Sequence, residues 1–299
     1  MRDTALRAVA LAGVAVGTLA CRDRQPAAAS GALARYDLGG TPTWRVRLPD
    51  ELREISGLAT AADGRVFAHG DEDATIYHID PRAGTITKRF TLAPTGSDPN
   101  LGKKAADGRL TGDFEGLAIA DDRFYLVTST GVLLEFGEGE DGAAVSYTAH
   151  PTALEKTCEV EGVDHDPAGK GLVLLCKTMR EKSERQQVAA YTWSPAERLL
   201  SDGPRWAVPW SGLEQVTRER QFNGSGLALT PGGDSFALIA GPQQLFAEVT
   251  TDGRPVAGGA LDKQAQPQPE GIAFLQDGTL LVSSEGGKGA ASLSGYAAR

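Results

Sequence analysis

The pentapeptide FEGLA at residues 114–118 is one of five related segments that determine the architecture of this chain. The other four are ISGLA at 55–59, VEGVD at 160–164, GSGLA at 224–228 and PEGIA at 269–273. Each has a glycine at its centre and is followed by turn residues and a second apolar stretch, which is typical of a β-hairpin. Successive glycines are 59, 46, 64 and 45 residues apart, so each interval has room for about four strands.

This repeat predicts an all-β fold, a five-bladed β-propeller. A single four-stranded sheet cannot bury both of its faces, and radial repetition gives each sheet a neighbour on either side. Six blades are the alternative if the 57–116 or the 162–226 interval contains a degenerate unit. The last unit is one strand short, so we expect TWRVRL at 43–48 to complete it and to close the ring.

The N-terminus predicts export. Arg2 and Arg7 flank the start of an apolar run at 8–20, which is typical of a secretory signal peptide. The run covers about 20 Å as a helix, which is shorter than the roughly 30 Å hydrocarbon core of a bilayer. It ends in TLAC, which resembles a bacterial lipobox. We therefore expect residues 1–21 to be a signal peptide and Cys21 to carry a lipid, with ordinary cleavage nearby as the alternative.

The rest of the chain is predicted to form a tether and one domain. Residues 22–34 are small and polar and have no apolar periodicity, as in a flexible tether, and residues 35–299 then form a single propeller domain. The lipid at Cys21 would hold the protein on a membrane, at the periplasmic face of the outer membrane. Without a lipid the protein is expected to be soluble in the periplasm or secreted.

Cys158 and Cys176 are candidates for a disulfide because an exported protein meets an oxidising environment. They flank a predicted hairpin, but strict pairing across its turn places them about three residues out of register. A disulfide and two separate buried thiols both remain open.

The residue before each repeat glycine is expected to lie close to the propeller axis. Several carboxylates around one narrow axis repel each other unless a cation lies between them, and oxygen ligands suit Ca²⁺. We therefore predict a calcium site formed by Glu115, Glu161 and Glu270. The alternative is that these glutamates accept hydrogen bonds from adjacent blades or pair with basic residues. The five positions are Ser56, Glu115, Glu161, Ser225 and Glu270.

A second set of residues follows each repeat glycine by fourteen positions. Its members are Asp71, Thr130, Cys176, Ala240 and Glu285, and Glu72 and Lys177 come one residue further on. From both sets we select the residues expected to line the funnel or bind a ligand. They are Ser56, Asp71, Glu72, Lys177, Ser225 and Glu285.

Several longer segments resemble the SdiA-regulated family of exported bacterial propeller proteins. They include EISGLA, GDFEGLA, EVEGVDHDPAGKGLVLLCK, FNGSGLAL and QPQPEGIAFLQDGTLLVSSEGG, and the resemblance extends over residues 44–296. It implies an exported propeller, similar in topology to calcium-dependent phytase-like and lactonase-like propellers. It implies little about activity, because the family is named for a regulatory association.

Composition and motifs leave two classes of function, a binding protein and a metal-dependent hydrolase. The net charge of −9 makes nucleic acid an unlikely partner, and no nucleophile elbow, HExxH or P-loop motif is present in the sequence. We expect an envelope protein that binds a small molecule or a protein partner and contains calcium. The alternative is a metal-dependent hydrolase similar to lactonases, esterases or phytases. A phosphate-rich substrate is disfavoured, because Lys177 is the only obvious base in the two sets.

Overall fold

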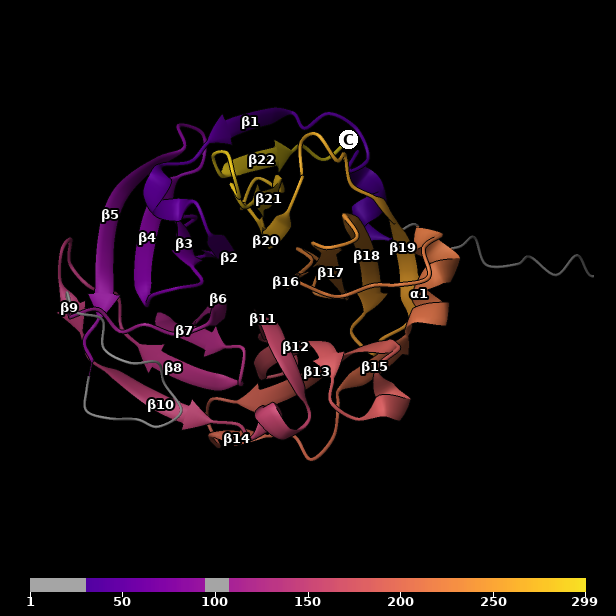
Figure 1. Ribbon diagram of the computed structural model, residues 1–299, viewed down its shortest axis with the longest axis horizontal. Helices are drawn as coiled ribbons and strands as arrows, with labels where there is room; N and C mark the ends of the chain where they lie inside the picture. Colours follow the sequence, from indigo (N-terminus) through magenta and orange to yellow (C-terminus); the bar gives the residue numbers. More distant parts are fainter. Residues whose placement is uncertain (1–30, 95–107) are drawn as a thin grey trace, which may run out of the picture.

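Five β-sheets surround a central axis in the computed structural model, which describes residues 31–94 and 108–299 (Figure 1). The sheets confirm the predicted propeller, and the described residues form five blades, not six. The expected signal peptide and the expected lipidation site at Cys21 lie outside the described residues. No helix among residues 31–94 and 108–299 is long and apolar enough to cross a membrane.

In each blade the strand that carries a repeat glycine is innermost, and the chain then proceeds outward (Figure 1). The strands of blade 1 are β2 (Ile55–Thr60), β3 (Val66–Gly70), β4 (Thr75–Asp80) and β5 (Thr85–Leu92). The strands of blade 2 are β6 (Phe114–Ala120), β7 (Arg123–Thr128), β8 (Val132–Phe136) and β10 (Tyr147–Pro151). The short β9 (Ala144–Val145) pairs in parallel with β5 and so links the two blades at their outer edges.

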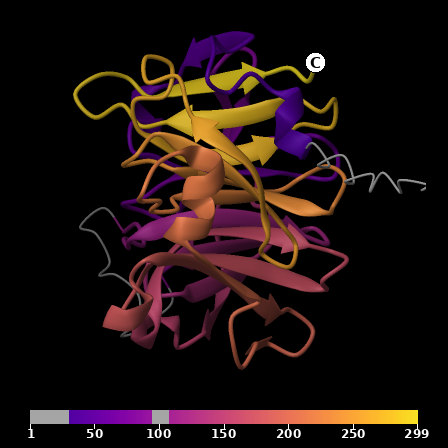
Figure 2. The same cartoon turned by 90° about the vertical axis from the view of Figure 1, so that its right-hand side faces the viewer.

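Blades 3 and 4 follow the same order. In the sequence, a helix lies between them. The strands of blade 3 are β11 (Cys158–Asp166), β12 (Gly171–Met179), β13 (Gln187–Ser194), β14 (Leu199–Leu200) and β15 (Trp206–Pro209). The strands of blade 4 are β16 (Gly226–Leu229), β17 (Ser235–Ala240), β18 (Leu245–Thr250) and β19 (Pro255–Ala260). Helix α1 (Trp210–Thr217) packs against the outer strands of blade 4 (Figure 2). Short 3₁₀ turns are η1 (Ala32–Arg35), η2 (Asp50–Leu52), η3 (Leu154–Lys156) and η4 (Lys182–Glu184).

Blade 5 is completed by the N-terminal strand, as the sequence predicted. Its strands are β20 (Pro269–Phe274), β21 (Leu280–Ser284), β22 (Ser292–Tyr296) and β1 (Trp44–Arg47). Strand β1 pairs antiparallel with β22, with Trp44 opposite Gly295. A Cβ atom at Gly295 would lie 2.1 Å from the Trp44 indole, so the ring packs directly on the glycine. The two ends of the chain therefore close the propeller within one sheet.

The N-terminal boundary lies earlier than expected. Residues 31–34, which the sequence placed in a tether, belong to the packed domain, and Leu33 is only 1% exposed. The buried carboxylate of Glu248 on β18 accepts hydrogen bonds from the backbone N–H groups of Ala32 and Leu33, both at 2.8 Å. The tether prediction fails at this end because the partner of these N–H groups lies more than 200 residues away in the sequence.

The hydrophobic core consists of five clusters, one between each pair of neighbouring blades. The cluster between blades 2 and 3 contains a disulfide that joins Cys158 on β11 to Cys176 on β12, with the two Cα atoms 5.7 Å apart. A register shift that leaves Lys177 of β12 unpaired accommodates the offset between the two cysteines, since Cys158 pairs with Met179 while Val160 pairs with Cys176. The disulfide is therefore a diagonal link within the inner hairpin of blade 3.

Candidate functional site

The five repeat glycines form the narrowest part of the axis. A Cβ atom on Gly116 would lie 2.9 Å from the Cα atom of Gly162, and one on Gly57 would lie 3.3 Å from the Cα atom of Gly116. The glycines of the other three blades meet the backbone of the next blade in the same way, at 2.6 to 3.4 Å. Glycine is required here because no side chain fits between the inner strands, and the axis opens into a mouth on either side of this ring.

β-Bulges direct the residue before each glycine toward one of these mouths. The pairing of inner and second strands shifts register at this residue in blades 1, 2, 3 and 5. In blade 4 the N–H of Ser225 donates to the carbonyl of Ile239, which is also the residue paired with Gly226. A bulge leaves one residue unpaired and re-aims its side chain. We call these five residues the inner ring; they are Ser56, Glu115, Glu161, Ser225 and Glu270.

An outer ring precedes the inner ring by two residues on every blade. All five members have a side-chain carbonyl or carboxylate oxygen. Their constant spacing from the repeat glycines is the sequence signal that could have identified this ring. The charges of this ring act on the inner ring, since Asp113 raises the pKa of Glu115 and Glu159 raises that of Glu161. The outer ring consists of Glu54, Asp113, Glu159, Asn223 and Gln268.

A third ring lies at the ends of the second strands, which run antiparallel to the inner strands and so end at the same mouth; we call it the return ring. Its members differ from the set predicted fourteen residues after each glycine. The N–H groups of Asp71, Ser129 and Glu285 donate to the carbonyls of outer-ring residues at 2.9 to 3.2 Å, which identifies equivalent positions. The hairpin turns differ in length, so a constant spacing of fourteen does not select these positions. The return ring consists of Asp71, Ser129, Lys177, Gly241 and Glu285.

Three members of the predicted second set therefore do not belong to the mouth. Cys176 is fully buried in the disulfide, Ala240 is fully buried in the core, and Thr130 lies one residue beyond its blade's equivalent position. Glu72 is exposed and lines a rim pocket beside Asp71. Lys177 belongs to the return ring, whereas the spacing placed it one residue further on.

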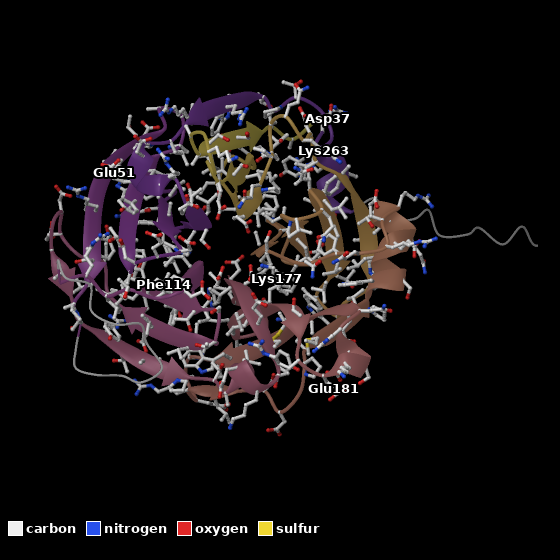
Figure 3. All side chains as sticks on the ribbon, in the orientation of Figure 1. Asp37, Glu51, Phe114, Lys177, Glu181 and Lys263 are labelled. Atoms are coloured by element: carbon white, nitrogen blue, oxygen red, sulfur yellow. A yellow bond between two sulfur atoms is a disulfide. The ribbon has the colours of Figure 1, made fainter. Side chains whose placement is uncertain are left out.

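The three rings together form an acidic funnel with a single lysine. Of its fifteen residues, eight are carboxylates and only Lys177 is a base. The Lys177 ammonium donates to Oε1 of Glu161 at 2.8 Å, and the Glu161 side chain is 4% exposed. Lys177 lies near the centre of the ring in Figure 3, whereas Glu181 and Asp37 lie at its periphery. The one ammonium therefore bonds Glu161, and its charge acts on Glu115 of blade 2 and Glu270 of blade 5.

Burial and mutual repulsion make these carboxylates hold protons more tightly than ordinary glutamates. Burial, followed by the charges of Glu161 and Asp113, raises the pKa of Glu115 to about 9. Burial, followed by the charges of Glu285 and Glu161, raises the pKa of Glu270 to about 8. Burial also raises the pKa of Glu161 to about 7, although the Lys177 charge opposes this shift. Positive charge placed in the funnel would be stabilised.

The pKa of Glu285, at the rim of the funnel, is also raised, to about 7. Burial is the main cause, and the nearby carboxylates of Glu54 and Asp71 add to it. The amide of Gln268 donates a hydrogen bond to Glu285, which opposes the shift. Four glutamates from three blades are therefore perturbed in the same direction by the same two causes.

Ser225, which the sequence placed among the residues that line the funnel or bind a ligand, has a structural role in the inner ring. The Ser225 hydroxyl donates to the carbonyl of Pro269 at 3.0 Å and accepts from the N–H of Gly241 at 2.9 Å. It thus joins blade 4 to blade 5. Ser56 is 5% exposed and, like Glu115 and Glu270, lines the axial cavity.

The funnel has the donor chemistry of a hard-cation site but not a preformed cage. Within the described ranges, no group of three or more His, Cys, Asp or Glu side chains is positioned to hold a metal ion. Glu161, one of the three expected ligands, is bonded to the Lys177 ammonium instead. Oxygen atoms from several blades still fit Ca²⁺, which accepts irregular coordination by six to eight oxygens.

Comparisons with known proteins support the fold. No protein-family profile and no curated protein matches this sequence. The structure is similar to Myxococcus xanthus glutaminyl cyclase, with a TM-score of 0.53, 13% sequence identity, and coverage of 85% of this chain and 94% of that chain. It is also similar to the PQQ-bound aldose sugar dehydrogenase from Streptomyces coelicolor, with a TM-score of 0.49, 11% identity, and coverage of 85% and 99%. At 13% identity, the likeness to the glutaminyl cyclase shows the propeller fold alone.

Proposed function

We propose that the acidic funnel binds a divalent cation, Ca²⁺, and that the chain is an exported, lipid-anchored binding protein of the SdiA-regulated type in the bacterial envelope. The observation that carries the cation site is the convergence of eight carboxylates from four blades on one mouth that contains a single ammonium. Glu115, Glu161 and Glu270 would hold the ion. The ion would neutralise carboxylates that now share Lys177.

Calcium fits this donor set better than magnesium does. Magnesium requires near-octahedral geometry and gives up its water reluctantly, whereas calcium accepts more ligands at variable positions. The inner ring offers carboxylates on blades 2, 3 and 5, which differ in burial and neighbours, so regular geometry is not expected. For Glu161 to bind the ion, its bond to Lys177 must open, and the ammonium would then turn toward the remaining carboxylates.

A metal-dependent hydrolase acting on a lactone or another neutral ester is the second candidate. The pKa values of Glu161 and Glu285 are both raised to about 7, which suits a general acid or base near neutral pH. Phosphate-rich substrates remain disfavoured, because the eight carboxylates would repel them and Lys177 is the only base among the fifteen funnel residues. Calcium-dependent turnover of a small ester panel distinguishes this candidate from a pure binding protein.

The experiment that tests the cation site is thermal unfolding of the chelator-treated protein with Ca²⁺, Mg²⁺ or Zn²⁺. A site-bound ion at a hundred times its Kd stabilises the native state by about 2.7 kcal/mol, which raises the Tm of a protein this size by a few degrees. We expect a calcium-selective rise that disappears in Glu270→Gln.

The matched control is Glu197→Gln, which removes an exposed carboxylate on the outer hairpin between β13 and β14. It should keep the full calcium response. If no ion shifts the native protein, or if the two variants respond alike, the funnel is not the cation site.

A further inference from the structure

The second mouth of the axis has the opposite character to the acidic funnel. The five inner strands run in the same direction, so residues after the repeat glycines face the end opposite the carboxylates. The residue that follows each glycine is buried and apolar. The residues three positions after the glycines are all partly exposed, and we call these five residues the apolar mouth. They are Thr60, Ile119, His165, Leu229 and Phe274.

These five residues line a cavity of about 300 Å³. Its walls come from β2, β6, β11, β16 and β20, so every blade contributes. Ile119, Leu229 and Phe274 give the cavity large apolar side chains, while polar atoms make up somewhat more than half of its exposed lining. Ligand sites in proteins are concave, mostly apolar and of roughly 300–1,000 Å³, with a few polar groups that orient the ligand. The cavity has the size of a small ligand site, with apolar side chains and polar groups side by side.

Some polar groups in this cavity already have hydrogen-bond partners within the protein, and others have none among the described residues. The Asp164 carboxylate accepts the N–H of His165 at 2.8 Å and the N–H of Leu229 at 2.7 Å, so both of its oxygens are used to join blades 3 and 4. The Thr60 hydroxyl oxygen is buried and has no partner among the described residues. The His165 ring also makes no hydrogen bond within the described part of the chain.

We infer that the apolar mouth binds a small, neutral molecule that has an apolar part and a polar group bonded to the partly exposed His165 ring. A ring nitrogen without a protein partner is available to donate or accept such a hydrogen bond. A charged ligand would lose hydration against Ile119, Leu229 and Phe274, and an anion would in addition be repelled by the Asp164 carboxylate in the lining. This site is independent of the cation site at the other mouth.

The test uses N-phenyl-1-naphthylamine, a neutral aromatic probe with one N–H group whose fluorescence rises in apolar surroundings. We expect saturable binding with one site per chain. Leu229→Glu and Ile119→Glu place a carboxylate in the apolar mouth at partly exposed positions, and each should weaken binding at least tenfold.

Leu199→Glu is the matched control, because Leu199 on β14 is 62% exposed and lies outside this cavity. It should bind the probe like the native protein. Circular dichroism checks that each variant is folded, and Ile119→Glu serves if a second carboxylate near Asp164 unfolds Leu229→Glu. Absence of saturable binding, or equal affinity in a folded Ile119→Glu variant, overturns the proposal. Loss of binding in Leu199→Glu would place the probe at Leu199 and would also overturn it.

Discussion

Lys177 is the residue on which the electrostatics of the acidic funnel depend. Its ammonium bonds Glu161 directly, and its charge also lowers the pKa of Glu115, Glu270 and Glu285. The Glu161 carboxylate in turn raises the pKa of Lys177, although burial opposes this. One side chain on blade 3 therefore acts as the internal counter-ion for carboxylates of blades 2, 3 and 5.

We expect Lys177→Met to destabilise the calcium-free protein and to strengthen its response to calcium. Removing one partner of a buried ion pair leaves an uncompensated charge, which costs a few kcal/mol, and here Glu161 can reduce that cost by binding a proton. We expect a loss of about 2 kcal/mol in the free energy of unfolding at pH 8, measured by urea denaturation.

Lys263→Met is the control for this variant, since Lys263 is exposed at the periphery of the ring (Figure 3). Its stability and calcium response should match those of the native protein. An unchanged calcium shift in Lys177→Met would mean that the ammonium does not compete for the site.

At the level of elements, each inner hairpin combines a bulge with a glycine. The bulge turns the preceding side chain into the funnel, and the glycine lets five strands approach one axis. The two features occur at adjacent residues, so a single local motif builds both the packing of the axis and the lining of the mouth.

Gly116→Ala should be strongly destabilising. The new Cβ atom would lie 2.8 Å from the backbone N of Val163 and 2.9 Å from the Cα of Gly162, and neither backbone atom can move aside. Overpacking of this kind costs about 1–3 kcal/mol. Urea denaturation measures the loss.

The matched variant is Gly203→Ala, where a Cβ atom meets nothing within 4 Å. We expect its free energy of unfolding to stay within about 0.5 kcal/mol of the native value. Equal stability of the two variants would show that the axis has more room than the glycine ring indicates.

For the whole molecule, the propeller brings together charges that are far apart along the chain. Glu115, Glu161, Glu270 and Glu285 all have raised pKa values, so the native protein binds more protons than the unfolded chain between their ordinary pKa of about 4.5 and their raised values of about 7 to 9. Their contribution to stability is therefore complete at low pH and is lost as the pH rises through this window.

We expect the Tm of the calcium-free protein to fall from pH 7 to pH 9, with a shallower fall in Glu270→Gln. Glu135, Glu138 and the buried His69 have lowered pKa values and act in the opposite direction, but only below the ordinary pKa of histidine at about 6.5, so this window avoids them. Saturating calcium should flatten the profile. A calcium-free Tm that is constant over this range contradicts the raised pKa values.

The sequence determined the propeller repeat, the strand that closes the ring and the inner-ring positions, and the structure decided for five blades over six. It could do so because hairpins are local: glycine, turn residues and alternating apolar residues within about fifteen positions specify each one. The same locality explains the positions of Glu115, Glu161 and Glu270 before their glycines. The missing strand of the last blade predicted that residues 43–48 close the ring, and the structure added the register, with Trp44 opposite Gly295.

Only the tertiary structure decided which residues share the funnel and what they do there. Turn lengths differ between blades, so Lys177 and not Cys176 faces the mouth, and a bulge brings Cys176 to Cys158 instead. The bond between Lys177 and Glu161 and the docking of Leu33 on Glu248 depend on distances in space. Electrostatic and hydrogen-bond energies follow those distances, and no local sequence pattern encodes them.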